Sequence, residues 1–291
     1  MPRSASIRGL LVEAEHTLAE GPHPERARLD AEALLLHAFR QSGTERNRAW
    51  LLAHDDETAG PAIVAVFRVL IARRRAGEPV QYIVGEAEFY GLPFRVTRNV
   101  LIPRPETEHL VEKAIELAGR FVRPRIADVG TGSGAIAVAL AARLPQATVT
   151  ATDRSGAALD LARSNAARNG VGDRIRFLEG DLLAPVAEES FEIVVSNPPY
   201  VAAEDRDSLA VEVRDYEPPL ALFGGRGGLE IYRRLIPAGF AVIVPGGFLA
   251  LEIGHGQQEA IGALLAASGF HAIEFTPDLQ GIPRVAAAQR A

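Results

Sequence analysis

The chain has 291 residues, of which 47% are hydrophobic and 23% charged, and its formal net charge is −6. This length and composition are typical of a globular protein with one large or two modest domains. Disulfides and thiolate metal sites are excluded because the sequence contains no cysteine. The negative charge argues against nucleic-acid phosphate as the main partner, since that affinity comes from cationic surface.

Neither a membrane segment nor a metal site is expected. No apolar run approaches the roughly 20 residues that a transmembrane helix needs. The start, Met1-Pro2-Arg3-Ser4, leads into an amphipathic pattern without an apolar signal region, so we expect a cytoplasmic protein. The 7 histidines are scattered without a ligand-like cluster, which predicts no metal.

The beginning of the chain predicts a small helical domain. Apolar residues recur at helical spacing over residues 7–20, 25–39 and 62–75. Residues 1–80 contain 11 arginines, 11 acidic residues and no lysine, so this part is charge-balanced rather than basic. We assign residues 1–78 to this domain, and its position before an α/β domain fits either a substrate-docking module or a stabilising cap.

A linker and a stiff loop follow the helical domain. Residues 79–100 predict a β-hairpin linker, because aromatic and β-branched residues surround a Gly-Leu-Pro turn. Residues 101–108 form a loop with two prolines, and Thr107 is expected to cap a helix over residues 109–120. The charged residues of this loop fit either a binding site or loop salt bridges: Arg104, Glu106 and Glu108.

Residues 101–291 predict an α/β domain. Short apolar strands alternate with helical patterns, which is typical of a mostly parallel sheet covered on both faces. The predicted strands span residues 125–129, 148–152, 174–178, 191–195, 247–252, 271–275 and 284–288. The helices between them are predicted over residues 135–143, 157–169, 229–242 and 257–267.

The stretch Asn197-Pro198-Pro199-Tyr200 comes directly after an apolar strand. The prolines fix φ at about −65° and remove N–H groups, so the strand ends and its carbonyls become free acceptors. Asn197 adds a side-chain acceptor, and Tyr200 adds a flat face with a polar tip. Together these groups suit a planar NH2 group held toward an electrophile. Taken alone, the four residues also fit an ordinary turn.

A glycine-rich turn at residues 128–134 joins a predicted strand to a helix. Its glycines permit positive φ and close backbone approach, so a ligand can lie against the loop and the helix N-terminus. The spacing also satisfies the dinucleotide fingerprint, and Asp153 lies at a suitable distance for a ribose in either case. Asp128 and a further acidic residue, Asp181, favour S-adenosylmethionine over a dinucleotide.

With both motifs in register, the chain resembles the HemK/PrmC family of protein-(glutamine-N5) methyltransferases, which modify peptide chain release factors. The resemblance covers most of the chain. Besides the two motifs it includes residues 85–91, 100–108, 216–222, 224–225, 227–229, 251–254, 257 and 278–281. The Ile-Pro-Arg-Pro-Glu-Thr-Glu stretch at residues 102–108 makes the resemblance specific to this family.

The resemblance implies a Rossmann-like class I methyltransferase sheet of seven mostly parallel strands, with S-adenosylmethionine as the cofactor. It implies that residues 130–134 hold the methionine portion, Asp153 the ribose, and Leu182 the adenine, with Asp181 near the adenine amino group. Family members often carry an aromatic residue where Leu182 stands, so this contact is apolar here. The implied cofactor-binding set is Asp128, Gly130, Thr131, Gly132, Ser133, Gly134, Asp153, Asp181, Leu182 and Asn197.

The implied reaction is methylation of the glutamine in the Gly-Gly-Gln motif of class I release factors, with the helical domain helping to dock this substrate. The implied catalytic residues are Asn197, Pro198 and Tyr200, and the substrate-binding set adds Pro199. We expect a monomer that does not bind nucleic acid directly.

Two other functions fit parts of the same sequence pattern. A nucleic-acid amino methyltransferase would use the same Asn-Pro-Pro-Tyr motif to hold an amino group, and it would flip the target base into its pocket. A dinucleotide-dependent oxidoreductase or nucleotide sensor shares the glycine-rich loop, but it leaves residues 197–200 unexplained.

Overall fold

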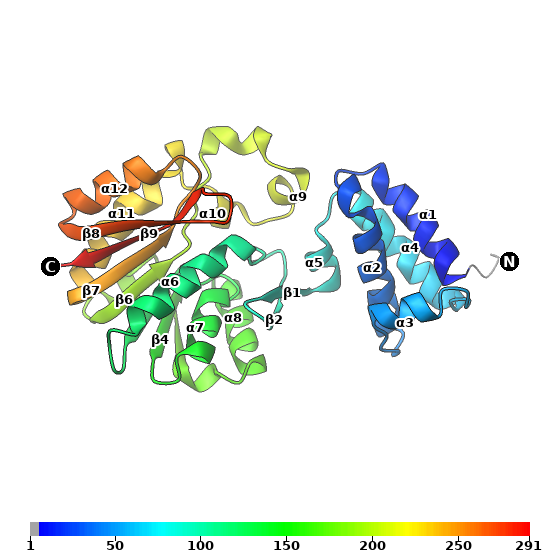
Figure 1. Cartoon of the computed structure of the whole chain (residues 1–291), viewed down its shortest axis with the longest axis horizontal. Coiled ribbons are helices and arrows are strands. Elements are labelled where there is room, and N and C mark those ends of the chain that lie inside the picture. The colour runs from blue at the N-terminus through cyan, green and yellow to red at the C-terminus, as the bar shows by residue number, and fades with distance from the viewer. Residues whose placement is uncertain (1–5) are drawn as a thin grey trace. The chain divides into compact units, whose positions relative to one another are not determined.

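The computed structural model describes residues 6–291 (Figure 1). The first residues, on which the expectation of a cytoplasmic protein partly rests, lie outside the described part. The chain forms two compact units. The helical unit runs to Gly85 and includes Ala210–Tyr216, and the sheet unit comprises Glu86–Leu209 and Glu217–Ala291. Within residues 6–291, no helix is long and apolar enough to cross a bilayer.

The helical unit contains the three predicted long helices and several short helices that were not predicted. Its helices are α1 (Ile7–Ala19), α2 (Ala27–Gln41), α3 (Arg48–Ala53), α4 (Pro61–Arg75), α5 (Val80–Val84) and α9 (Val211–Arg214), with a 3₁₀ turn at Pro24–Arg26. The Ser6 side chain caps α1 by accepting a hydrogen bond from the Gly9 N–H at 3.1 Å. The apolar faces of α1, α2 and α4 pack into one core around the buried Leu10, Leu34 and Phe67.

A hairpin is confirmed after the helical unit, but it is shorter than predicted. Of residues 79–100, Val80–Val84 form α5, and the antiparallel pairing is confined to β1 (Glu86–Phe89) and β2 (Leu92–Arg95). Gly85 separates helix from hairpin at a φ of +80°, a conformation that glycine adopts without strain. The prediction was wrong at residues 80–84 because five residues are too few for helical and strand periodicity to differ.

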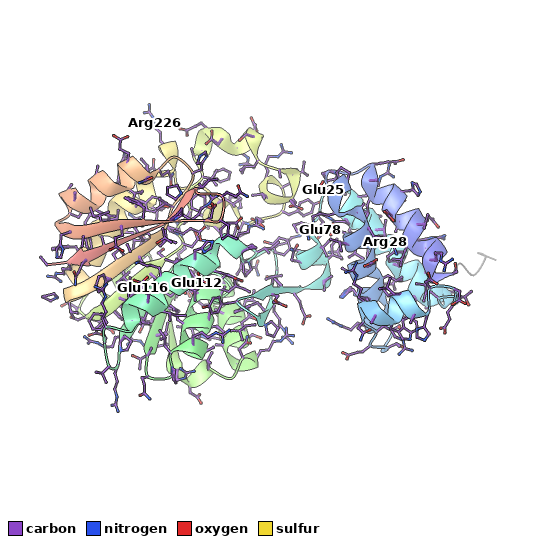
Figure 2. The ribbon with its side chains drawn as sticks, in the orientation of Figure 1. Glu25, Arg28, Glu78, Glu112, Glu116 and Arg226 are labelled. Atoms are coloured by element: carbon purple, nitrogen blue, oxygen red, sulfur yellow. The ribbon has the colours of Figure 1, made fainter. Side chains whose placement is uncertain are left out.

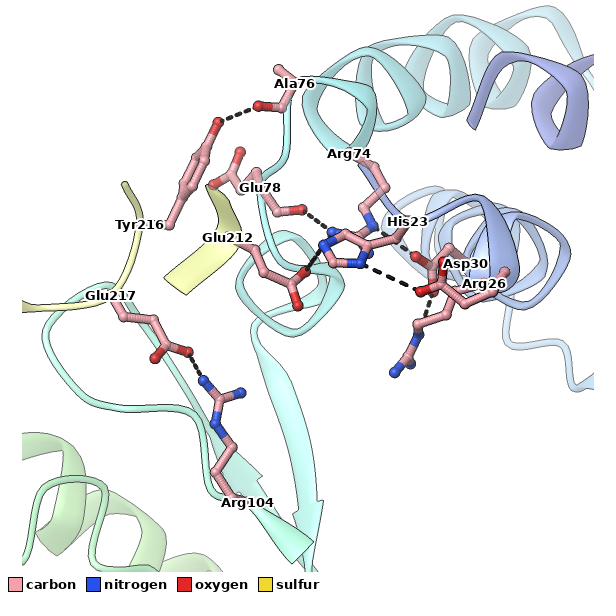
Figure 3. Close-up of polar contacts among 11 residues, drawn as sticks. His23, Arg26, Asp30, Arg74, Ala76, Glu78, Arg104, Glu212, Tyr216 and Glu217 are labelled. Carbon is pink, nitrogen blue, oxygen red and sulfur yellow. Dashed lines mark hydrogen bonds and ion pairs between the residues drawn. The ribbon is translucent and has the colours of Figure 1, made fainter. Parts of the chain in front are cut away.

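The segment Ala210–Tyr216 belongs to the helical unit although it lies far along the chain. Arg74, which is 4% exposed, donates to Asp30 at 2.6 Å and to Glu212 at 2.9 Å (Figure 3). The Tyr216 hydroxyl donates to the carbonyl of Ala76 at 3.1 Å. The sequence patterns assigned this segment to residues 101–291, because pairing of charges distant in sequence leaves no periodic signal.

The sheet unit confirms the predicted seven-stranded, mostly parallel sheet. Its strands are β3 (Arg125–Val129), β4 (Thr148–Asp153), β5 (Ile175–Glu179), β6 (Phe191–Ser196), β7 (Ile243–Glu252), β8 (Phe270–Pro277) and β9 (Pro283–Arg290). The spatial order is β5-β4-β3-β6-β7-β9-β8, and β9 runs opposite to the strands on either side of it, β7 and β8. From β3 the chain continues to β4 and β5 on one side, and from β6 it continues to β7 on the other side, so the direction of strand addition reverses between β3 and β6. Open α/β sheets bind ligands at such a reversal, beside the carboxyl ends of the strands.

Helices cover both faces of this sheet (Figure 1). The first face packs against α6 (Glu108–Ala118), α7 (Ala135–Arg143) and α8 (Gly156–Arg168), and the second against α11 (Glu230–Val242) and α12 (Gln258–Ala267). Side chains of β6 alternate between the faces: Ile193 and Val195 join the first core, and Val194 joins the second. The short helix α10 (Pro219–Leu222) was not predicted.

Ion pairs form within single helices and between elements of one unit. In the helical unit, Arg28, which Figure 2 labels on α2, pairs with Glu32 of the same helix at 2.7 Å. In the sheet unit, Lys113 on α6 is the only lysine of the sequence and pairs at 3.1 Å with Glu116, which Figure 2 labels. Its second partner, Glu274 at 3.0 Å, lies on β8, so this pair connects α6 to the sheet edge.

Candidate active site

The glycine-rich loop after β3 presents an open backbone face. Gly130, Gly132 and Gly134 have φ values of +73°, +54° and +81°. A Cβ atom at Gly134 would lie 3.0 Å from the Ala162 Cβ, so this glycine allows α7 and α8 to approach closely. A Cβ atom at Gly130 or Gly132 would meet nothing within 4 Å. The first two glycines therefore expose backbone toward free space, as a ligand-binding loop requires.

Asp153, at the end of β4, holds this loop in place. One carboxylate oxygen accepts the Gly132 N–H at 2.9 Å, and the other accepts the Ser155 N–H at 2.9 Å. The carboxylate thus joins the loop after β3 to the start of α8. Its predicted contact with a ribose stays a prediction.

Asp128 lies beneath the loop and is fully buried. Its Oδ2 accepts hydrogen bonds from the Thr131 hydroxyl at 2.6 Å and the Ala137 N–H at 3.1 Å. Its Oδ1 has no hydrogen-bond partner within residues 6–291. Burial raises the pKa of Asp128 to about 7. The carboxyl group supports the loop from below, and its predicted contact with the cofactor stays a prediction.

We expect Asp128→Asn to reduce the pH dependence of stability. Because the pKa of Asp128 is raised from 3.8 to about 7 on folding, the folded state favours the protonated carboxyl. This stabilisation is complete below about pH 4 and is lost as the pH rises through about 7. Between about pH 4 and pH 7, the free energy of unfolding of the wild type should therefore fall by on the order of 4 kcal/mol more than that of the variant. Urea unfolding at several pH values measures it, and parallel curves for the two proteins would contradict it.

A cavity of about 330 Å³ lies at the carboxyl ends of the strands. Nine predicted site residues line it: Gly130, Thr131, Gly132, Ser133, Asp153, Asp181, Leu182, Asn197 and Pro199. Four predicted site residues do not line it: Asp128, Gly134, Pro198 and Tyr200. The lining also contains residues that the motifs did not single out, among them Arg98, Asn99, Val100, Leu220 and Ile231.

Asp181 and Leu182 reach the cavity from the turn after β5. Asp181 forms an ion pair with Arg234 of α11. Leu182 has a φ of +51°, which is uncommon for a residue other than glycine. Its carbonyl accepts the Thr152 hydroxyl at 2.8 Å, and this hydrogen bond anchors the turn to β4.

Asn197 begins the loop after β6 and connects to a buried polar network. Its side-chain Nδ2 donates to the Thr107 hydroxyl oxygen at 3.1 Å. The Thr107 hydroxyl donates in turn to Oε2 of Glu252 at 2.6 Å. The prediction that Thr107 caps the following helix with its side chain was wrong, because this hydroxyl makes no cap hydrogen bond.

Tyr200 is held at its backbone and at its ring. Its carbonyl accepts Nε2 of Gln257 at 3.1 Å, while Oε1 of Gln257 accepts the Gly254 N–H at 2.9 Å. The phenol hydroxyl lies 3.4 Å from Oε1 of Glu252, which is a long hydrogen bond. Burial raises the pKa of Tyr200, so the phenol is neutral in the physiological range.

A second glycine-rich segment, residues 224–228, packs against the loop after β6. The Gly224 N–H donates to the carbonyl of Val201 at 2.9 Å. A Cβ atom at Gly224 would lie 2.3 Å from the carbonyl oxygen of Pro199, and one at Gly228 would lie 2.0 Å from that of Tyr200. These glycines are therefore required by close backbone approach.

The sequence left open whether the charged residues of the loop at 101–108 line a binding site or form salt bridges, and the structure shows both. Arg104 lines the cavity and forms an ion pair with the buried Glu217 at 2.6 Å (Figure 3). Glu108 accepts the Tyr90 N–H at 2.8 Å, which fastens the hairpin to the start of α6.

Asn165, which sequence reasoning missed, also fastens the hairpin, because its fully buried side chain donates to the carbonyls of Arg95 and Ser133.

The strand order, the glycine-rich loop after β3 and the Asn-Pro-Pro-Tyr loop after β6 define a class I methyltransferase. Solved structures agree in fold. A methyltransferase from Pyrococcus furiosus matches 69% of this chain and 90% of its own, with a TM-score of 0.50 and 19% identity. The 16S rRNA N2 G1207 methyltransferase RsmC of Thermus thermophilus, solved with AdoMet and guanosine, matches 71% of this chain and 50% of its own, with a TM-score of 0.52 and 20% identity.

Sequence comparisons identify the family. Residues 107–213 match the model of the methyltransferase small domain, and residues 9–85 match that of the PrmC N-terminal domain. The release factor glutamine methyltransferase of Moorella thermoacetica is 44% identical over 98% of this chain and 99% of its own. That of Deinococcus radiodurans is 42% identical over the same shares. The chain belongs to the release factor glutamine methyltransferase family, as its motifs predicted.

Proposed function

We propose that this protein transfers a methyl group from S-adenosylmethionine to the side-chain amide nitrogen of the glutamine in the Gly-Gly-Gln motif of class I release factors. The observation that carries the proposal is the placement of Asn197 in the lining of the cavity that the glycine-rich loop also lines. The names of the relatives at 42–44% identity support a protein substrate over a nucleic acid. A cytoplasmic location and a monomeric state stay predictions.

The residues around the cavity fit S-adenosylmethionine. A volume of about 330 Å³ lies in the range of small-molecule sites. Gly130 and Gly132 present open backbone to a methionine portion, and the carboxylates of Asp153 and Asp181 suit ribose hydroxyls and an amino group. When bound, the cofactor supplies an electrophilic methyl group on a sulfonium sulfur.

The groups after β6 orient the attacking amide. A carboxamide nitrogen is a weak nucleophile because its lone pair is delocalised. Asn197 Oδ1 and the backbone carbonyl of Pro198 accept its two hydrogens, which fixes the amide plane and directs the nitrogen toward the methyl group. Tyr200 is proposed to pack on the glutamine side chain, although neither Pro198 nor Tyr200 lines the cavity, so the substrate contacts of both residues stay predictions. No strong general base is needed if the proton leaves the charged product nitrogen after transfer.

The decisive experiment is mass spectrometry of purified release factor after incubation with this protein and S-adenosylmethionine. A single added methyl on the Gly-Gly-Gln glutamine is expected. DNA and RNA should be incubated in parallel with labelled cofactor. Methyl transfer to nucleic acid, or none to release factor despite demonstrated cofactor binding, would contradict the proposal.

The helical unit, with residues 1–78 as its predicted extent, is proposed to dock the release factor. Its own apolar core and its balanced charge support a role in protein recognition rather than phosphate binding. We therefore expect kcat/KM for a complete release factor to exceed that for a short Gly-Gly-Gln peptide by about tenfold or more, the effect of roughly 1.4 kcal/mol of additional binding. Steady-state kinetics measures both values, and equal values would favour a stabilising cap.

We expect Asp153→Ala to weaken S-adenosylmethionine binding by about 10- to 100-fold. The variant loses the carboxylate that fixes the Gly132 N–H, and hydrogen bonds to charged groups contribute about 1.5–3 kcal/mol each. Isothermal titration calorimetry measures the affinity. Asp160→Ala is the matched control, because Asp160 is an exposed aspartate of α8 outside the cavity lining. Equal affinities of the two variants would contradict the assigned role of Asp153.

A further inference from the structure

We propose that Glu252 is a positioning residue, which acts through Thr107 to determine which end of the Asn197 side-chain amide faces the substrate. The inference rests on the proposed function and extends it to residues outside the Asn-Pro-Pro-Tyr motif. Thr107 precedes α6 and Glu252 ends β7, so three separate parts of the sheet unit contribute to one network.

The direction of the network follows from the number of available hydrogens. A threonine hydroxyl has one hydrogen to donate and also accepts. The carboxylate of Glu252 can only accept, and it lies 2.6 Å from the Thr107 hydroxyl, so it takes that hydrogen. The atom of Asn197 that lies 3.1 Å from Thr107 must then be the donor, Nδ2. The acceptor Oδ1 is thereby left at the opposite end of the amide.

That orientation is the one that the proposed reaction needs. No donor within residues 6–291 forms a hydrogen bond with Asn197 Oδ1, so this oxygen is available to a substrate N–H. A reversed amide would present its own hydrogens to the substrate NH2 group and repel it. Glu252 acts indirectly, because it is 2% exposed and does not line the cavity, whereas Thr107 and Asn197 do.

Protonation of Glu252 would remove this control. A protonated carboxyl can donate to Thr107, which frees the threonine hydrogen for Asn197 Oδ1 and allows the amide to turn. Burial raises the pKa of Glu252 to about 7, and its hydrogen bonds from Thr107 and Tyr200 oppose the shift. The titratable or charged groups that face Glu252 are Glu106 before α6, Tyr200 after β6, Tyr232 on α11 and Arg284 on β9.

Matched variants test the network kinetically. Thr107→Val keeps the shape but removes the hydroxyl, and we expect kcat to fall by about tenfold or more, as loss of one oriented hydrogen bond implies. KM for release factor and the cofactor Kd should change much less. Thr107→Ser restores the hydroxyl and should lie within about threefold of wild-type kcat. A purely structural role predicts no such separation of kcat from binding.

The pH profile tests Glu252 itself. At saturating cofactor, wild-type kcat should fall as the pH is lowered through about 7, because Glu252 takes up a proton. In Glu252→Gln the side chain cannot titrate, so kcat should be lower at high pH and this acidic limb should be absent. An unchanged limb in Glu252→Gln, or wild-type kcat in Thr107→Val, would overturn the inference.

A spectroscopic measurement is independent of methyl transfer. The sequence has five asparagines, so ¹⁵N-asparagine labelling gives few side-chain amide signals, and Asn197→Asp identifies the one of interest. This signal should shift with pH around 7 in the wild type and not in Glu252→Gln. If the Asn197 side-chain amide signal of the wild type does not shift with pH around 7, the proposed role of Glu252 is refuted. If the wild type leaves release factor unmethylated, the proposed function fails, and the amide signal still decides the inference.

Discussion

Asn197→Ala should lower kcat by about 100-fold or more, while the affinity for S-adenosylmethionine falls much less. The variant removes the acceptor that orients the amide nitrogen, and loss of one oriented transition-state contact has an effect of this size. Most of the cofactor-binding groups lie elsewhere, on the loop after β3 and at the ends of β4 and β5. Single-turnover kinetics with release factor, combined with calorimetric cofactor binding, measures the two effects separately.

Asn169→Ala provides the matched control. Asn169 follows α8 as its C-cap, outside the cavity lining, and its side-chain amide donates to the backbone carbonyls of Pro93 and Asn165, so kcat should stay close to the wild-type value. Near-normal turnover in Asn197→Ala would refute the mechanism. A large loss of cofactor affinity in that variant would instead show that Asn197 mainly supports the cofactor.

Gly228→Ala should reduce kcat by about 100-fold, although residue 228 is not expected to touch either substrate. A Cβ atom there would lie 2.0 Å from the Tyr200 carbonyl oxygen and 2.7 Å from Nε2 of Gln257. The loop after β6 must move to relieve this overlap. A displacement of about 1 Å in a positioning group costs on the order of 100-fold in rate. Methylation assays measure the loss, and circular dichroism verifies that the variant is folded.

Gly227→Ala separates this overlap from backbone strain. Gly227 and Gly228 have similar positive φ values, +62° and +70°, so alanine is strained at both positions. A Cβ atom at Gly227 would meet nothing within 4 Å. Gly227→Ala should therefore lose some stability but keep most of its activity. Equal losses of activity in the two variants would mean that strain, and not displacement of Tyr200, is responsible.

The buried polar network gives the methyltransferase site a structural basis that the Asn-Pro-Pro-Tyr motif does not contain. Four residues cannot specify how an amide is oriented, since either end of Asn197 can occupy the same space. Thr107 and Glu252 resolve this by fixing where hydrogens are donated. Gln257 does the same for the Tyr200 carbonyl. Mutations at these supporting positions should therefore affect turnover more than binding.

Much of the fold followed from local patterns. The strand at Arg125–Val129 and the helix at Ala135–Arg143 have the predicted bounds, because each is a continuous apolar element with turn residues at its ends. The glycine-rich loop and the loop at 197–200 were recognisable because their chemistry lies in consecutive residues. Short helices such as Val80–Val84 and Val211–Arg214 were missed, since they are too short to show a period.

Local patterns along the chain were enough to predict the fold class, the family and the two motifs that meet in the cavity. The residues that support those motifs became visible only in the folded protein. The Thr107 hydroxyl proved to bind Glu252, which is 145 positions away, instead of capping its own helix. Asp128 proved to lie beneath the loop, with a pKa raised to about 7 by burial. A side chain's hydrogen-bond partners and burial depend on elements that are distant in sequence, so local sequence patterns cannot predict them.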